Sequence, residues 1–304
     1  MPAPLQPSGP REGTIRLPVV AEGVGLHSGA SVRMALRPAP AGGGIRFERT
    51  DLEGFVVEAH AANIAQVSYA TSLMKRGVLI STTEHVLSAL VGLEMDNVVV
   101  ELDNLEVPIL DGSALPFVEM LDRARPRQLP RPRRFMRVLR PVELEEGEKF
   151  IGLYPDDRYR VSYAINFPHP VIGRQQLEIE LTPENYRREL APARTFGFLR
   201  DVEAMRRQGL IRGGSMENAV VLSETGVANG PLRFPDEFVR HKVLDLIGDL
   251  ALLGHPLRGY VKADRAGHAL HTALVKRLAR ERDLWELETA APAPAPVLAR
   301  AAAR

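Results

Sequence analysis

The sequence has 304 residues, 45% of them hydrophobic, and a formal net charge of +1 at pH 7. This length suits one large domain or two of about 150 residues, and the balanced charge argues against a nucleic-acid-binding protein. The chain has no cysteine, which excludes disulfides and thiolate metal ligands and agrees with the cytoplasm, where we expect the protein. No apolar stretch approaches the 18 or so residues of a membrane-spanning helix, so we expect no stable membrane insertion.

The N-terminal half alternates strand patterns with two helices, behind a tail rich in proline and glycine. We predict a disordered tail at 1–13 and an α+β domain at 14–127. The expected elements, in chain order, are strands at 14–20 and 32–39, a helix at 84–93, a strand at 96–103 and a helix at 114–124. A turn-rich stretch, EGVGLHSGA (22–30), lacks the lysine of a Walker loop and opens no obvious helix, so we reject binding of nucleoside triphosphates.

A basic, proline-rich run, RPRQLPRPRRFMR (125–137), separates the two halves of the chain. We predict a solvated linker at 128–134, because proline interrupts regular structure and a charge run usually stays in water. A role in binding phosphate or a membrane surface is the alternative interpretation of the same residues.

The C-terminal half repeats the order of the first, and we predict a second α+β domain at 135–286 and a disordered tail at 287–304. The expected elements are strands at 135–147, 149–155, 158–167 and 218–222, and helices at 199–209, 234–256 and 269–281. A short echo, HVLSALVGL against HKVLDLIGDL, is compatible with an internal repeat and also with chance. We therefore predict an α+β fold of two similarly ordered halves, each with a helix that begins near a histidine.

The helix expected at 234–256 carries a polar stripe. At 100° per residue, one arc of this helix holds Phe238, His241, Lys242, Asp245 and Asp249, opposite a wider apolar arc. An ordinary amphipathic helix with a solvated face has the same pattern. The alternative is half of a metal site, because residues four apart on a helix have Cβ atoms about 5–6 Å from each other. Zinc accepts imidazole nitrogen and carboxylate oxygen, and a catalytic zinc has three protein ligands.

A third ligand could come from the helix at 84–93. His85 follows Glu84 at its start, and a zinc hydrolase can use such a pair, with the histidine on the metal and the carboxylate as general base. The alternative interpretation is a capping box from Ser81 to Glu84, in which the glutamate bonds back to the helix N-terminus. Spacing alone does not decide between the two.

Two further residues have both a functional and a structural interpretation. His268, after Gly267 at a helix start, could be a general acid, because histidine titrates near neutral pH, or a surface residue. Thr195 could donate a hydrogen bond to an oxyanion or simply serve a turn.

Seven ordered motifs together resemble a known family, that of the UDP-3-O-acyl-N-acetylglucosamine deacetylases, the zinc amidases of bacterial lipid A synthesis. The resemblance covers nearly the whole chain between the tails. The motifs are GVGLHSG, STTEHVLSALVGLEMDN, VPILDGSALPFVEML, ARTFGFLRDVE, GGSMENAVV, FPDEFVRHKVLDLIGDLALLGHP and GHAL. The resemblance implies two domains of similar topology, helices packed between two sheets, and an active site at the domain interface.

The resemblance also implies the residues of the site. One Zn²⁺ per chain would be held by His85, His241 and Asp245. The catalytic residues would be Glu84 as general base, His268 as general acid, Asp249 orienting this histidine, and Thr195 as an oxyanion donor. The substrate-binding residues would be Lys242 near the scissile amide, Phe167 and Arg265 near the UDP part, and Leu199, Ile211 and Met216 along an acyl passage formed by the segment 195–222.

The sequence departs from the family pattern at three places. Arg265 stands where lysine is common, which changes the hydrogen-bonding geometry at the same charge. His271 and Thr272 stand where an asparagine pair is common. The triplet MEN at 216–218 also differs, which affects the expected fit of the acyl chain. None of these positions is an expected metal ligand.

The function implied by the resemblance is removal of the acetyl group from UDP-3-O-(3-hydroxyacyl)-N-acetylglucosamine, the committed step of lipid A synthesis in a Gram-negative bacterium. The expected partner is this acylated sugar nucleotide, and no sequence feature demands an oligomer, so we expect a monomer. A deacetylase for another N-acyl sugar would differ in its response to the 3-O-acyl chain. A non-catalytic sugar-nucleotide-binding protein would hold no zinc and would not change on Glu84→Ala.

Overall fold

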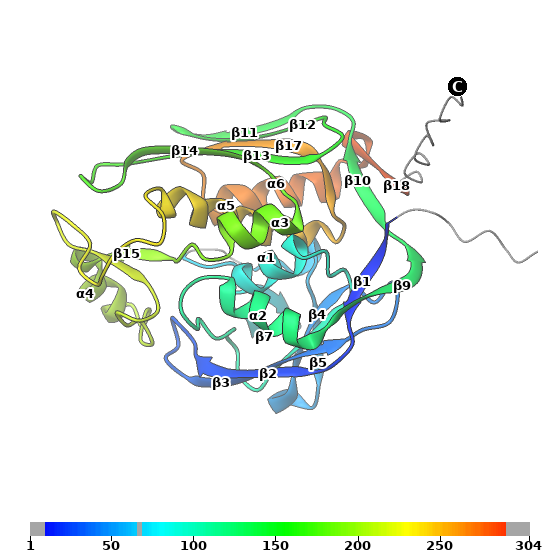
Figure 1. The fold of residues 1–304 in the computed structure, drawn as a ribbon, viewed down its shortest axis with the longest axis horizontal. Helices are drawn as coiled ribbons and strands as arrows, with labels where there is room; N and C mark the ends of the chain where they lie inside the picture. Colours follow the sequence, from blue (N-terminus) through cyan, green and yellow to red (C-terminus); the bar gives the residue numbers. More distant parts are fainter. Residues whose placement is uncertain (1–9, 66–68, 290–304) are drawn as a thin grey trace, which may run out of the picture.

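Two sheets face each other across a layer of helices in the computed structural model, which describes residues 10–65 and 69–289 (Figure 1). The N-terminal sheet has five strands, in the order β2 (Val19–Val24), β3 (Ser31–Pro38), β8 (Val98–Leu102), β4 (Ile45–Arg49) and β5 (Phe55–Glu58). The C-terminal sheet has seven strands: β11 (Val142–Glu146), β12 (Lys149–Tyr154), β17 (Leu257–Asp264), β13 (Tyr159–Phe167), β14 (Gly173–Glu180), β10 (Arg134–Val138) and β18 (Trp285–Thr289). The α+β class predicted from the sequence is confirmed.

The two sheets share one connectivity. In the first, β2 pairs with β3, β3 with β8, β8 runs parallel to β4, and β4 pairs with β5. In the second, β11, β12, β17, β13 and β14 repeat these pairings in the same order, again with one parallel pair, β13 with β17. The prediction of two halves with similar topology is therefore confirmed, whereas the exact domain bounds at 14–127 and 135–286 remain a prediction.

The helical layer consists of two equivalent pairs of helices. These are α1 (Glu84–Gly92) and α2 (Leu115–Ala124) from the first half, and α5 (Glu237–Leu250) and α6 (His268–Arg280) from the second. Figure 1 shows them between the sheets, and their buried aliphatic side chains join those of both sheets in one core. Among the described residues, no helix is both long and apolar enough to cross a membrane.

Short elements complete the fold. The segment predicted as an insert forms its own lobe, with β15 (Phe196–Phe198) parallel to β16 (Val220–Leu222) and α4 (Leu199–Arg207) between them. The hairpin β6 (Leu73–Lys75) and β7 (Val78–Ile80) precedes α1. The remaining turns of helix are η1 (Thr50–Leu52), η2 (Ala61–Asn63), α3 (Pro183–Asn185), η3 (Tyr186–Leu190), η4 (Ala251–Leu253) and η5 (Arg282–Leu284).

The basic run that contains the linker expected at 128–134 has regular structure. It forms strand β9 (Pro126–Pro132), which pairs antiparallel with β1 (Arg11–Ile15) in a two-stranded ribbon along one side of the molecule (Figure 1). Proline is compatible with such a strand, because a two-stranded ribbon leaves half of its backbone N–H groups without a ladder partner. The predicted linker segment is therefore part of a largely exposed strand, and its role as the connection between two domains remains a prediction.

The predicted tails were also too long. Residues 11–13 belong to β1 and residues 287–289 to β18, while the predicted tail residues 1–9 and 290–304 lie outside the described residues. The strand expected at 14–20 is divided between β1 and β2, because the chain leaves one ribbon at Ile15 and enters the five-stranded sheet at Val19.

Helices α1 and α5 cross at a glycine. A Cβ atom on Gly248 would lie 2.0 Å from the carbonyl oxygen of Glu84, so only glycine allows the two backbones to approach this closely. The short echo in the sequence covers these same helices, with His85 and His241 at equivalent positions. The crossing therefore brings the start of α1 against the C-terminal part of α5.

We predict that Gly248→Ala destabilises the protein by about 1–3 kcal/mol or more, because an added methyl group must push α1 away from α5. Urea unfolding measures this change. Gly226→Ala is the matched control, since a Cβ there has no heavy atom within 4 Å, and it should change stability by less than about 0.5 kcal/mol. Equal unfolding midpoints for the two variants would show that the helices do not need this close contact.

Candidate active site

Two histidines and an aspartate converge where α1 and α5 cross. The ligand atoms of His85, His241 and Asp245 all lie within 4.8 Å of one another, and all three residues are buried. Asp245 Oδ1 is 3.3 Å from His241 Nε2 and 3.6 Å from His85 Nε2. The polar stripe of α5 is therefore not a solvated face: the interpretation as an ordinary amphipathic helix is wrong, because α1, α6 and the segment at 193–196 cover it.

The donor atoms of this group fit a metal cation. His241 Nδ1 lies 3.0 Å from the carbonyl oxygen of Ala193, so this nitrogen carries the proton and Nε2 turns a lone pair toward Asp245. Burial lowers the pKa of His241 to about 4, which keeps the ring neutral. Asp245 Oδ1 is buried without a hydrogen-bond partner among the described residues. A lone pair facing an unpartnered carboxylate oxygen is repulsive, and a cation between them removes the repulsion.

Asp245 is held as a carboxylate. Burial opposes its charge, but His241 and Lys242 hold its pKa well below the usual range. Lys242 Nζ donates to Asp245 Oδ2 at 2.9 Å and lies 5.5 Å from the centre of the Phe196 ring. The lysine thus binds one carboxylate oxygen and leaves the other, Oδ1, directed toward the two histidines.

Glu84 lies next to this group and does not cap its own helix. Its Oε2 accepts a hydrogen bond from the backbone N–H of Thr71 at 3.0 Å, while the N–H of Ser81 donates to Leu105. The capping-box interpretation is therefore wrong, because the carboxylate of Glu84 binds the N–H of Thr71, just before β6, instead of the start of its own helix. Burial raises the pKa of Glu84, which is the direction that suits a group accepting a proton near neutral pH.

His268 forms a short pair with Asp249. Its Nδ1 lies 2.7 Å from Asp249 Oδ2, and its Nε2 lies 3.9 Å from Glu84 Oε1. Burial opposes the charged ring, but Asp249 and the neighbouring carboxylates prevail and raise the pKa of His268 to about 9. The ring therefore carries a positive charge at neutral pH and presents an Nε2–H to the same space as Glu84.

Three residues around Asp249 were missed by the sequence analysis. His271 Nδ1 contacts the same Asp249 oxygen at 2.8 Å, and its Nε2 lies 3.0 Å from the hydroxyl of Tyr163. Thr71 contacts the other Asp249 oxygen through its hydroxyl and lies 3.2 Å from His268 Nδ1. The only sequence signal was the unusual His271 after GHAL, noted as a family departure, whereas Thr71 and Tyr163 come from distant segments without any motif.

A cavity of about 550 Å³ opens onto these groups. Six of the sequence-predicted site residues line it beside the catalytic and ligand groups: Thr195, Lys242, Phe167, Leu199, Ile211 and Met216. Asp249 lies behind His268, outside the lining. Arg265 is also outside it and is paired with Glu148 and Asp264, so a contact of Arg265 with substrate remains a prediction.

The loop at 25–29, set aside as a phosphate loop, instead forms one wall of the cavity. Leu26 and His27 line the cavity, and the carboxylate of Glu106 accepts hydrogen bonds from the N–H groups of His27 and Ser28. The same carboxylate accepts from the hydroxyl of Thr82, whose φ of 57° is costly for a β-branched residue. Glu106 thus fixes both this loop and the residues that lead into α1.

The insert lobe closes the opposite side. The N–H groups of Arg212 and Gly213 donate to the carbonyls of His27 and Leu26, at 3.2 and 3.1 Å, so the lobe meets the N-terminal half across the cavity. Together with Leu199, Ile211 and Met216, the lobe contributes Val202 and Met205 to an apolar wall. One end of the cavity is therefore polar and charged, and the other end is apolar.

The fold and the site define a class. A buried His-His-Asp group that fits a cation, with a proton-accepting carboxylate and a charged histidine beside it in a deep cavity, is the arrangement of a metal-dependent hydrolase.

Comparison with known proteins gives the family. Residues 12–280 match the family LpxC, UDP-3-O-acyl N-acetylglycosamine deacetylase, and the chain belongs to this family. A UDP-3-O-acyl-N-acetylglucosamine deacetylase of Solibacter usitatus is 53% identical over 279 residues, which are 91% of this chain and 94% of the relative. A protein of the same name from Phenylobacterium zucineum is 47% identical, over 91% of this chain and 96% of its own. Another, from Acidithiobacillus ferrooxidans, is 43% identical over 94% and 95%.

We predict that Asp249→Asn lowers the pKa of His268 by about 1–3 units, because the neutral amide no longer favours the charged ring. NMR titration of the imidazole in metal-free protein measures the pKa. In the native protein, a folded-state pKa of about 9 exceeds the unfolded value of 6.5. Protonation of His268 therefore stabilises the fold fully below pH 6.5, and this stabilisation is lost as the pH rises through about 9.

Asp283→Asn is the control for this titration, because Asp283 pairs with Arg140 at the surface and should leave His268 unchanged. An unaltered His268 titration in Asp249→Asn would contradict the assigned pairing.

Proposed function

We propose that the protein is a zinc-dependent amidase that converts UDP-3-O-(3-hydroxyacyl)-N-acetylglucosamine and water into acetate and the free-amine sugar nucleotide, a step of lipid A biosynthesis. Family membership supports the substrate class. The observation that carries the metal chemistry is the unpartnered Asp245 Oδ1, faced by the side-chain nitrogens of His85 and His241. Zinc is the metal that favours this set of two nitrogens and one oxygen in a catalytic site.

When bound there, zinc would supply a Lewis acid and lower the pKa of a water molecule toward neutrality. Glu84 accepts a proton from the attacking water, and its raised pKa keeps it a useful base. The water oxygen forms a bond with the acetamide carbon, and the carbonyl oxygen gains negative charge. The positive ring of His268 and the hydroxyl of Thr195 stabilise that charge, which is the role of an oxyanion hole.

The second half of the reaction needs a proton on the leaving nitrogen. His268, charged at neutral pH, or protonated Glu84 donates it, and the carbon–nitrogen bond then breaks to release acetate and the amine. Asp249 accepts a hydrogen bond from Nδ1–H of His268 and so holds the ring in the orientation that directs Nε2–H toward the cavity. His271 and Thr71 hold Asp249 by its two oxygens, so they act as positioning residues.

The two ends of the cavity match the two parts of the substrate. Leu199 and Met216 keep 43% and 49% of their surface exposed at the apolar end, which is apolar surface that an acyl chain would cover. Lys242 lies at the polar end beside Asp245, where the sugar would bind. Phe167 lines the cavity against Phe196 and Phe198, so its contact with the UDP part remains a prediction. A cytoplasmic location and a monomeric state remain predictions for this protein.

We predict that Glu84→Gln lowers the rate of acetate release from the acylated sugar nucleotide by about 10²–10⁴, because the amide cannot accept the water proton. Metal content, measured by elemental analysis, should stay near one zinc per chain. His241→Ala should lose both the metal and the activity. Zinc-free wild-type protein with full activity would overturn the zinc proposal, and full activity in Glu84→Gln would overturn its assignment as base.

We also predict that kcat/KM falls roughly fourfold for each methylene removed from the 3-O-acyl chain, as long as the chain fills the apolar wall. Steady-state kinetics on substrates of graded chain length tests this dependence. Equal kcat/KM for the acylated sugar nucleotide and for the same compound without its acyl chain would favour a deacetylase for another N-acyl sugar.

A further inference from the structure

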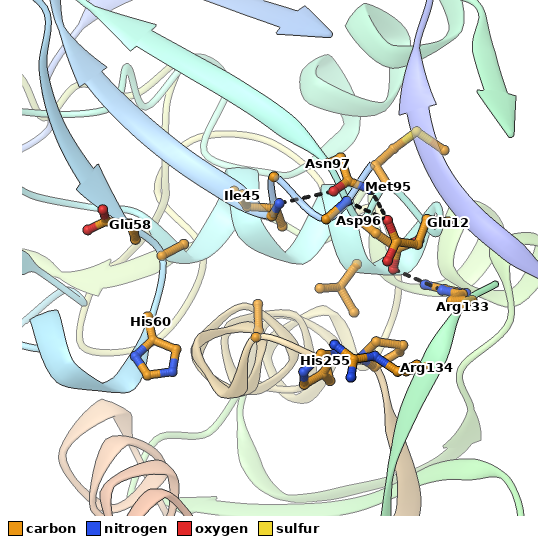
Figure 2. A pocket seen from close by; sticks show the side chains of 18 of the residues that line it. Glu12, Ile45, Glu58, His60, Met95, Asp96, Asn97, Arg133, Arg134 and His255 are labelled. Carbon is orange, nitrogen blue, oxygen red and sulfur yellow. Dashed lines mark hydrogen bonds and ion pairs between the residues drawn. The ribbon is translucent and has the colours of Figure 1, made fainter. Parts of the chain in front are cut away.

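A second cavity, of about 310 Å³, lies at the other end of the two helices that carry the metal group. Helix α1 begins with Glu84 and His85 at the active site, and Val91 near its end lines the second cavity. Helix α5 continues into η4, where Ala251 and Gly254 contribute to the lining. The other walls come from residues 42–45, from residues 58–60 at the end of β5, and from the arginines at 131, 133 and 134 where β9 leads into β10. Figure 2 shows these walls around the space.

The carboxylates in the lining already have cationic partners. Glu12 lies 3.2 Å from Arg131 and also accepts from the backbone of Gly42. Asp96 lies 2.9 Å from Arg133, which Figure 2 shows on the same side of the cavity. Glu58, the third lining carboxylate, pairs with Lys75 at 2.8 Å. The negative charges of the lining are therefore neutralised by neighbouring side chains.

Arg134 is the exception among the lining cations. It forms no ion pair with any described residue, and its Nε is buried without a hydrogen-bond partner. Leaving a cationic donor unpaired away from water is costly. A bound anion would remove this cost by accepting charge-assisted hydrogen bonds from the guanidinium.

Two histidines of the lining add nitrogen donors, His255 next to Arg134 and His60 on the other side of the space (Figure 2). Figure 2 shows His255 next to Arg134, and its ring makes no hydrogen bond to the described residues. Burial is the main cause that lowers the pKa of His255; the positive charge of Arg134 adds to it and Glu12 opposes it, so the ring lies within the electrostatic reach of Arg134. His60 accepts a hydrogen bond on Nδ1 from the N–H of Ala62, which leaves Nε2–H as a donor. No metal-binding group of the described residues includes either histidine.

We propose that this interdomain cavity binds a small organic oxyanion, with its phosphate or carboxylate group on Arg134 and His255. The rest of the ligand would lie against the apolar part of the lining, which includes Ile45, Val91 and Met95. The volume is at the lower end of the range for small-molecule sites, which fits a compact metabolite better than a sugar nucleotide. This site is separate from the proposed deacetylase chemistry and does not depend on it.

The test uses fluorophosphate, a doubly charged oxyanion, observed by ¹⁹F NMR line broadening during titration with the zinc-loaded protein. Wild-type protein should give saturable broadening that inorganic phosphate reverses. Arg134→Gln should weaken binding at least about tenfold, because it removes the unpaired charge. Arg134→Lys should keep binding within a few-fold of wild type, which separates loss of charge from loss of fold.

Arg137→Gln is the matched control, because Arg137 lies on the same strand, β10, outside the cavity, with its side chain 45% exposed. It should bind fluorophosphate like the wild type. Two results would overturn the proposal: no saturable broadening with wild-type protein, or equal affinity in Arg134→Gln and wild type. Equal affinity would mean that the anion binds elsewhere, including the larger active-site cavity.

Discussion

The close crossing of α1 and α5 is the constraint on which the site depends. Because Gly248 has no side chain, the backbone of α5 contacts the carbonyl of Glu84, and the histidines of the two repeat helices face one carboxylate. Neither half of the chain contains the complete group. Joining the halves therefore creates both the core between the sheets and the chemistry, and a change at the crossing should affect both.

The same crossing concentrates buried charge, which is costly unless every group has a partner. The site meets this requirement by linking its groups: Lys242 bonds to Asp245, His268 and His271 bond to Asp249, and Thr71 bonds to Glu84. Asp245 Oδ1 is left without a partner among the described residues, and in the cavity wall both ring nitrogens of His27 are as well. An unpartnered carboxylate oxygen that faces His85 and His241 fits a metal cation, which is the basis of the proposed zinc site.

The sequence predicted the fold class, the repeated order of elements and the residues that lie together at the crossing, because long ordered motifs encode them. It did not predict that β9 pairs with β1. The side chains of this proline-rich strand show no period-two pattern, and its strand conformation depends on hydrogen bonds to β1, which is distant in sequence. Thr71, His271 and Tyr163 were missed for a similar reason. Their roles come from contacts between segments about 20 to 200 residues apart, so no short sequence motif predicts them.

The most direct test of the metal centre is the position of the metal in crystals of the zinc-loaded protein, measured by anomalous scattering at the zinc edge. A single strong peak should lie about 2.0–2.2 Å from His85 Nε2, His241 Nε2 and Asp245 Oδ1. A peak instead between Asp249, His268 and His271, the other group of described residues with metal-ligand spacing, would contradict the assignment. So would the absence of any peak at the crossing of α1 and α5.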